Sequence, residues 1–306
     1  RLRAEYSTSD PELDLSVRAE NISLRSLFES SPRRGLSARL SGITADLSAD
    51  ARIGLSPFSV SYSSSGNVRV PRTLVPGGAA VSYSLSGDRA GIDIAEFSVT
   101  GDDVDASLSA SCRFADLNIS GSADIRRILL PNGNPLSAEL YFDPMERGFM
   151  MFSPQVTVGG RQFTALQLTL APSSDSYDFR FEVSDYSHNS DGGPGRIGLD
   201  GSFMDGFRYV QTGVSLDSLY LDSLVSSLSL FLPQGHQERI SALASQLNTY
   251  LLTGDAYLST DFANITYNVP YIMLADTAHD GRALLLSASG NGQSVQVERL
   301  NLILGG

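Results

Sequence analysis

The stretch Asp105-Ala106-Ser107-Leu108-Ser109-Ala110-Ser111-Cys112-Arg113-Phe114 alternates polar and apolar side chains without a break. Successive side chains of a β-strand point to opposite faces of a sheet, so this segment predicts a strand with one apolar and one hydrophilic face. The same alternation recurs along the chain, at Leu13–Val17, Val81–Leu85, Leu136–Phe142, Tyr177–Val183, Ile197–Phe203 and Ile265–Val269. Antiparallel sheets with one face in water have this pattern.

Short turn signals separate these segments. They include Ser86-Gly87-Asp88, Thr100–Asp103, Pro131–Pro135 and Asp191–Pro194, and Gly159-Gly160 predicts a tight hairpin. Each strand is therefore expected to pair with the next one, as in a meander. The unit "strand, Ser/Gly/Asp turn, strand" recurs loosely every 20–40 residues or so, which is typical of a repeat array.

Helical signal is confined to a few places. Ile22–Phe28 and Ile125–Leu130 suit single turns or short helices, and Gln237–Leu252 places Ile240, Leu243, Leu247 and Leu251 on one helical stripe. Asp217–Leu232 is ambiguous and suits a helix ended by Pro233. We therefore predict a β region over residues 1–215 and a helical insert with closing strands over 216–306, or one continuous domain.

Composition narrows the class of protein. The 306 residues carry a net charge of −12, and only 18% are charged, so serine supplies much of the polar surface. All basic residues are arginine and they are scattered, which argues against a nucleic-acid surface. Cys112 is the one cysteine, so no disulfide forms within the chain. No window reaches the length of a membrane helix. Because the sequence opens without Met on polar residues, we expect a processed or internal segment whose leader or anchor lies outside it.

The residues that usually carry catalysis form no recognisable constellation. His188, His236 and His279 each lie beside turn residues, with no pair at metal-ligand spacing. The acidic groups at Asp102–Asp105 and at Asp185 with Asp191 suit solvated turns, with a calcium site as the alternative. No Gly-x-Ser-x-Gly elbow and no phosphate loop occurs. We predict no enzyme, no catalytic or metal residue and no cofactor.

An apolar face this extensive must be covered. A second sheet or closure into a barrel would cover it. A sheet curled into a groove would instead hold lipid chains, because each methylene left in water costs about 0.8 kcal/mol. The residues predicted to line such a groove are Val81, Tyr83, Leu85, Leu108, Phe114, Leu140, Phe142, Phe149, Met151, Phe163, Leu168, Phe179, Phe181, Leu199 and Phe203.

Segments such as Leu36-Ser37-Ala38-Arg39-Leu40-Ser41-Gly42, Ala106–Ala110 and Ile119-Ser120-Gly121-Ser122-Ala123-Asp124-Ile125 resemble the degenerate repeats of the AsmA-like family, and of its TamB (translocation and assembly module) branch most closely. The resemblance covers residues 10–210 in rhythm and composition. It implies a long periplasmic β-sheet folded like a taco, anchored to the inner membrane by a helix outside this sequence. It also implies phospholipid transport to the outer membrane and an outer-membrane assembly partner. The missing anchor and the Gln237–Leu252 helix depart from the family pattern.

The fold class predicted is therefore mainly β: a long antiparallel sheet of amphipathic strands curled into a taco-like groove, with a short helical insert near 217–252. The function expected first is periplasmic lipid transport, with phospholipid acyl chains as partners and a role in outer-membrane biogenesis. An adhesion or scaffold protein built as a sandwich or solenoid is the alternative, with a binding surface in loops such as Ser187–Gly195. An outer-membrane barrel and a hydrolase are the other two.

Overall fold

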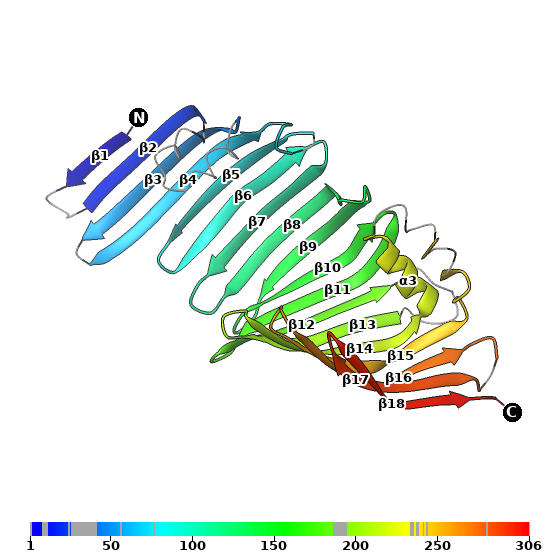
Figure 1. Ribbon diagram of the computed structural model, residues 1–306. Coiled ribbons are helices and arrows are strands. Elements are labelled where there is room, and N and C mark those ends of the chain that lie inside the picture. The colour runs from blue at the N-terminus through cyan, green and yellow to red at the C-terminus, as the bar shows by residue number, and fades with distance from the viewer. Residues whose placement is uncertain are drawn as a thin grey trace. The chain divides into compact units, whose positions relative to one another are not determined.

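The computed structural model describes residues 2–7, 12–23, 25, 42–55, 57–75, 77–185, 195–232, 236, 239–240, 242, 244–279 and 281–305. It confirms the predicted fold class. Strands make up 72% of the structure and helices 6%, and the 18 strands form one long antiparallel sheet that is not closed into a barrel (Figure 1). The chain divides into two compact units, Arg1–Ile128 with Glu139–Glu146 and Leu129–Ala138 with Arg147–Gly306.

In the first unit, strands β1 to β8 pair in chain order, each antiparallel to the next. The predicted meander is therefore present here. The strands of this unit are β1 (Leu2–Ser7), β2 (Glu12–Ser23), β3 (Thr44–Leu55), β4 (Phe58–Val70), β5 (Ala79–Asp88), β6 (Gly91–Gly101), β7 (Val104–Arg113) and β8 (Asn118–Leu129), and β9 (Pro135–Pro144) spans the boundary between the units.

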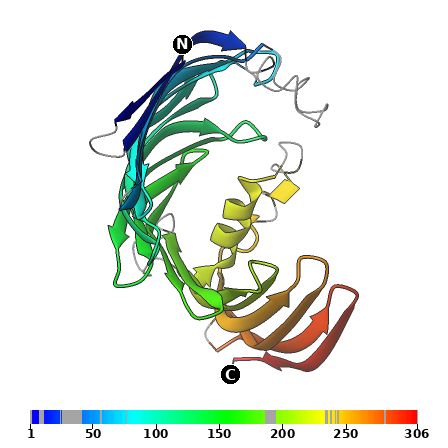
Figure 2. The ribbon, with the colours of Figure 1, turned by 90° about the vertical axis from the view of Figure 1, so that its left-hand side faces the viewer.

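In the second unit, strands β10 to β18 pair in the same consecutive way, and the helix α3 (Leu221–Ser229) connects β14 to β15. Figure 2 shows the strands of this unit curving around α3. Its strands are β10 (Phe149–Val158), β11 (Arg161–Pro172), β12 (Ser176–Asp185), β13 (Gly195–Met204), β14 (Tyr209–Tyr220), β15 (Tyr250–Thr260), β16 (Ile265–Asp276), β17 (Ala283–Asn291) and β18 (Ser294–Ile303). The Gly159-Gly160 hairpin joins β10 to β11 as predicted.

β-Bulges shift the pairing register at several points and keep apolar side chains on one face. Across β6 and β7 the register shifts between Ile94 and Phe97, and across β14 and β15 between Leu216 and Leu219. One extra residue in a strand turns the spacing of same-face residues from two into three. Some bulges contain a residue with positive φ, such as Ala165 (50°) and Ser218 (52°).

One helix prediction was wrong for this reason, and another was right only for its first part. Ile125–Leu130 lies almost wholly in β8, where a bulge between the pairs Ala106–Ile125 and Asp105–Arg127 spaces Ile125 and Ile128 three apart. In the Gln237–Leu252 prediction, the described residues are helical only as far as Ala244, and Tyr250–Leu252 belong to β15. His236, expected in a loop, is helical and exposed.

The remaining helix predictions had mixed outcomes. Of Asp217–Leu232, the first four residues complete β14 and Leu221–Ser229 form α3. Ile22 and Ser23 end β2 rather than starting a helix. Most of the rest of Ile22–Phe28, together with His188, Asp191 and Leu36–Ser41, lies outside the described residues.

Tyrosine rings cover glycines that lie directly across from them on the neighbouring strand. In the first unit Tyr83 faces Gly66, and a Cβ added to Gly66 would lie 3.0 Å from the Tyr83 ring. Tyr267 and Gly290 are paired in the same way in the second unit, with a corresponding distance of 2.6 Å to the Tyr267 hydroxyl. Such rings replace the packing that a strand glycine lacks.

Candidate functional site: the apolar face of the sheet

In each unit, the pairing of residues across strands assigns each side chain to one of the two faces of the sheet. Directly paired residues of an antiparallel sheet lie on the same face, so the register decides this assignment. We call the face that carries Leu15, Ala51, Tyr62, Leu85 and their partners the apolar face of the first unit. Its members in β2 to β8 include Leu13, Leu15, Val17, Leu47, Ala51, Ile53, Val60, Tyr62, Val68, Val81, Tyr83, Leu85, Ile92, Ile94, Phe97, Val99, Ala106, Leu108, Ala110, Cys112, Ile119, Ala123 and Ile125.

The apolar face of the second unit is assigned by the same pairings and continues through its bulges. It includes Phe149, Met151, Val156, Phe163, Leu168, Leu170, Phe179, Phe181, Val183, Ile197, Leu199, Phe203, Val210, Val214, Leu216, Leu252, Leu258, Tyr267, Val269, Ile272, Leu274, Leu284, Leu286, Leu300 and Leu302. Among its described side chains, the charged ones are Arg161 and Asp276, and each lies at the end of a strand.

The register places most of the predicted lining residues on these two faces. In the first unit Val81, Tyr83, Leu85 and Leu108 share the apolar face. In the second unit all eight predicted residues from β10 to β13 do so. Leu140 and Phe142 share one side of β9 and are half-buried. Phe114 lies in the β7–β8 turn instead, with 53% of its surface exposed.

Few side chains on these faces are fully buried by the rest of the described chain. The apolar residues that count as buried are Ile43, Ala45, Ala138, Val158, Leu219, Ala244 and Ala288, four of them alanines, and Ser153 is the largest fully buried side chain. A packed interior would bury its leucines and phenylalanines first. Instead, residues such as Leu108, Phe181 and Leu199 are half-buried by their neighbours within the sheet. The described residues thus cover these faces only in part: most of their named members are half-buried, and Phe97, Leu300 and Leu302 are exposed.

The helix α3 buries polar side chains and leaves one leucine of its apolar stripe exposed. Asp222, Ser223 and Ser229 are buried, whereas Leu228 is 58% exposed. The exposed apolar side chains continue past the helix in Phe231 (58%). A helix that only closed a hydrophobic core would have the opposite orientation. Leu221, Leu224 and Val225 are half-buried, so the exposed apolar surface of the helix is at Leu228.

Two asparagines hold the far end of this helical segment. The Asn134 amide donates to the carbonyl oxygen of Leu230 at 2.8 Å, and Asn132 donates to the same oxygen and to that of Leu232, the latter at 3.1 Å. Both asparagines lie in the β8–β9 turn, about a hundred residues earlier in the chain. Carbonyls at a helix C-terminus lack partners within the helix, so these amides fix the position of the segment.

The opposite face of each unit is hydrophilic and carries ion pairs between strands. Arg52 pairs with Asp14 at 3.0 Å in the first unit, and Arg196 pairs with Glu182 at 3.1 Å in the second. These groups are exposed, so each pair adds little stability. Serines fill much of the remainder of this face, for example Ser111, which is hydrogen-bonded to Ser120 at 2.8 Å.

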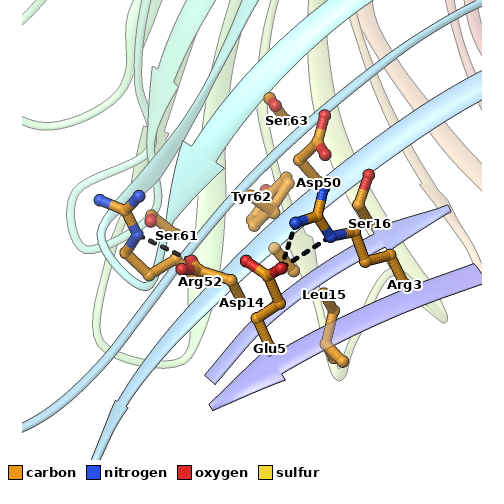
Figure 3. Close-up of a pocket in the computed structure, with 11 residues that line it drawn as sticks. Arg3, Glu5, Asp14, Leu15, Ser16, Asp50, Arg52, Ser61, Tyr62 and Ser63 are labelled. Atoms are coloured by element: carbon orange, nitrogen blue, oxygen red, sulfur yellow. Dashed lines mark hydrogen bonds and ion pairs between the residues drawn. The ribbon is translucent and has the colours of Figure 1, made fainter. Parts of the chain in front are cut away.

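The pocket drawn in Figure 3 belongs to this hydrophilic side. It is lined by residues of β1 to β4, among them Arg3, Glu5, Asp14, Asp50 and Arg52, and Arg3 pairs with Glu5. Its serines are Ser16, Ser61 and Ser63. Ion pairs already engage both of its arginines. Over the described part of the chain, no three His, Cys, Asp or Glu residues are grouped as a metal site. No helix there is long and apolar enough to cross a bilayer.

The comparisons with known proteins found nothing similar: no family model, no curated protein and no solved structure matches this chain. The candidate site consequently rests on the geometry of the apolar faces.

Cys112 offers a chemical probe of the apolar face. It pairs with Ile92 and Ile119, and burial raises the pKa of its thiol, which the Asp116 carboxylate raises further. Because the thiolate is the reactive form, we expect iodoacetamide to alkylate Cys112 more slowly at neutral pH in the folded protein than in urea. The rate of the folded protein should continue to rise at pH values where that of the unfolded protein has levelled off. Identical pH profiles in the two states would contradict this assignment.

Proposed function

We propose that the apolar faces bind lipid acyl chains and that the protein carries phospholipid between two membranes of a cell envelope. One observation carries the proposal. In both units a strand face made largely of Leu, Ile, Val and Phe side chains is only half-buried by the described residues, with few of its members fully buried. Isolated apolar side chains on a surface are common, whereas continuous apolar patches mark binding surfaces.

The chemistry of the faces suits an extended hydrocarbon chain. Each methylene transferred from water to such a surface contributes about 0.8 kcal/mol, and no specific hydrogen bond is needed. On the first unit's apolar face, the Ser64 hydroxyl is engaged within the sheet: it lies 3.3 Å from the Tyr83 hydroxyl and 3.2 Å from the Ser48 carbonyl oxygen. No charged side chain lies among the described members of that face.

The resemblance to the AsmA-like family and its TamB branch supports a location in the periplasm. On this proposal the chain is a segment of a bridge between inner and outer membranes, anchored by a part of the protein outside this sequence. An outer-membrane assembly protein is the partner that the resemblance suggests. A scaffold or adhesion protein is the alternative, and it needs a filled interior and a binding surface in the loops.

The test is to identify what the protein carries after purification. We expect native mass spectrometry of the protein, purified without detergent, to show adducts with the masses of phospholipids, and solvent extraction to release the same lipids. An equal amount of a soluble β-protein with a closed core, purified from the same cells, is the control. Adduct-free protein that also fails to take up phospholipid from vesicles would overturn the proposal.

A further inference from the structure

We propose that one rim of each unit's sheet inserts phenylalanine side chains into the surface of a lipid bilayer. This inference concerns the turns and goes beyond the lipid-carrying faces. In a meander every second turn lies at the same rim. We define the aromatic rim as the turns that lead from an odd-numbered to the next even-numbered strand. Phe58, Phe114, Phe207 and Phe262 lie at four of these turns, with 59%, 53%, 48% and 70% of their surface exposed.

In the first unit, contacts between successive turns place Phe58 and Phe114 at the same rim. The guanidinium of Arg89, in the β5–β6 turn, lies 5.4 Å from the centre of the Phe58 ring. The next residue, Ala90, accepts a hydrogen bond of 2.9 Å from the backbone of Phe114. The order along the rim is therefore Phe58, the Arg89-Ala90 turn and Phe114.

In the second unit, the backbone is held in a costly conformation to present the rings. Phe207 has φ +68° and Phe262 has φ +66°, values that bulky residues rarely adopt. The Phe207 ring stacks on Tyr177 at 4.9 Å, and the Phe262 turn is fixed by Asp261, which accepts hydrogen bonds from Ala263 and Asn264. Strain of this kind is kept at functional sites when the surrounding structure enforces it.

Among the described residues, the short turns of the opposite rim differ in composition. Its short described turns contain residues such as Asp102-Asp103, Asn132 and Gly159-Gly160, and none of them holds Phe, Tyr or Trp. In the first unit, the described turns of this opposite rim carry an exposed apolar side chain at Leu74, in the β4–β5 turn, with 40% of its surface exposed. In the second unit the long α3 connection is the exception, since it carries Phe231. The short described turns at the two rims therefore differ in their content of aromatic residues.

The spacing of the rings favours a bilayer over a folded protein partner. Neighbouring strands lie about 4.8 Å apart, so turns two strands apart are separated by about 10 Å. The exposed rings therefore lie at separate turns among polar residues, with Phe207 packed against Tyr177 and Phe203 of its own unit. A protein partner needs a continuous contact of roughly 800 Å² per side, whereas aromatic side chains enter the interface of a membrane individually. Because the same turns hold both arginines and aspartates, such as Arg89 with Asp88 and Arg208 with Asp205, insertion should not require anionic lipid.

The chain contains no tryptophan, so single tryptophans can report on the rim. The experiment introduces F58W, F114W, F207W or F262W and mixes each protein with phosphatidylcholine vesicles, with and without bromine on the acyl chains. We expect a blue-shifted emission that brominated lipid quenches. The controls are L74W at the opposite rim and Y257W, whose tyrosine is 57% exposed on the hydrophilic face. Neither control should respond.

Two further measurements keep the result interpretable if a tryptophan variant misfolds. The double variants Phe58→Ser/Phe114→Ser and Phe207→Ser/Phe262→Ser, checked by circular dichroism, should each weaken vesicle binding about tenfold or more. Raising the salt from about 0.1 M to about 1 M, which shortens the Debye length roughly threefold, should leave binding unchanged.

Three outcomes would overturn the inference. They are equal quenching of the rim and control tryptophans, binding that requires anionic lipid and is lost in salt, and a blue shift without vesicles that grows with protein concentration, which would show a second copy of the chain at the rim. The result is separable from the proposed function. A rim that binds vesicles on a protein that carries no lipid would support this inference and oppose the other.

Discussion

Replacing Leu108 by Glu is expected to remove bound phospholipid from the first unit, whereas the same replacement at the adjacent Ser109 should not. The two residues are neighbours in β7 and face opposite sides: Leu108 pairs with Phe97 and Ala123 on the apolar face, and Ser109 pairs with Ser122 on the hydrophilic face. If a hydrated carboxylate keeps about four methylenes of an acyl chain in water, the loss is about 3 kcal/mol. Affinity would fall more than about a hundredfold.

The second unit offers a matched pair of its own. Phe179 lies on the apolar face between Leu170 and Gly201, and Arg180 next to it is exposed on the hydrophilic face. Phe179→Glu should therefore lose lipid and Arg180→Glu should keep it, as measured by native mass spectrometry. Circular dichroism and denaturant midpoints establish that all four proteins fold. Equal lipid retention in the members of both pairs would mean that the apolar faces do not hold lipid.

Alternation of side chains predicted the strands and the meander because that period depends on backbone geometry alone. Phe179 and Phe181, for example, lie in one strand on one face as expected. The prediction failed in β8, where a bulge intervened. In β8 a bulge separates Ile125 and Ile128 by three residues, which in sequence matches the spacing of a helix. A bulged strand and a helix can be told apart here only from the pairing with the neighbouring strand, and the local sequence does not specify that pairing.

Bulges also explain why residues of opposite parity line the same face. Phe163 and Leu168 are five apart, so strict alternation would place them on opposite sides of β11. The register shift between Thr164 and Gln167, with Ala165 at φ +50°, brings both to the apolar face. The shift belongs to the pairing of β11 with β12, because β10 and β11 keep one register throughout, with Ser153 opposite Leu166 and Gln155 opposite Thr164.

The helix and the aromatic rim show what periodicity misses. The apolar stripe of Leu221, Leu224, Val225 and Leu228 predicted a helix, and α3 is a helix, but Leu228 is exposed and Asp222 is buried. Period alone does not determine which side of a helix is covered when the neighbouring sheet is itself apolar. Of the rim phenylalanines, the sequence carried a prediction only for Phe114, as a residue lining the groove. Their common location follows from the parity of the turns, which requires the complete strand order.

The largest effect on stability is expected for Gly148→Ala, compared with Gly160→Ala as a matched control. The two glycines precede β10 and β11 and have almost the same backbone, φ +87° and +86°. An alanine at either position pays about 1 kcal/mol for the left-handed conformation. A Cβ on Gly160 has nothing within 4 Å, but on Gly148 it would lie 1.9 Å from the Leu170 carbonyl oxygen and 2.8 Å from the Ala171 Cα.

Because those atoms belong to the backbone, the clash at Gly148 cannot be relieved by a side-chain rotation. β10 and β11 must separate where Phe149 pairs with Leu170, so Gly148→Ala should lower the free energy of unfolding by about 4 kcal/mol or more. Hydrogen exchange should show the loss first at the Phe149 end of the hairpin, and at the Gly160 end only on global opening. Equal destabilisation by the two alanines would mean that conformation alone, and not the close approach of β11, requires glycine at position 148.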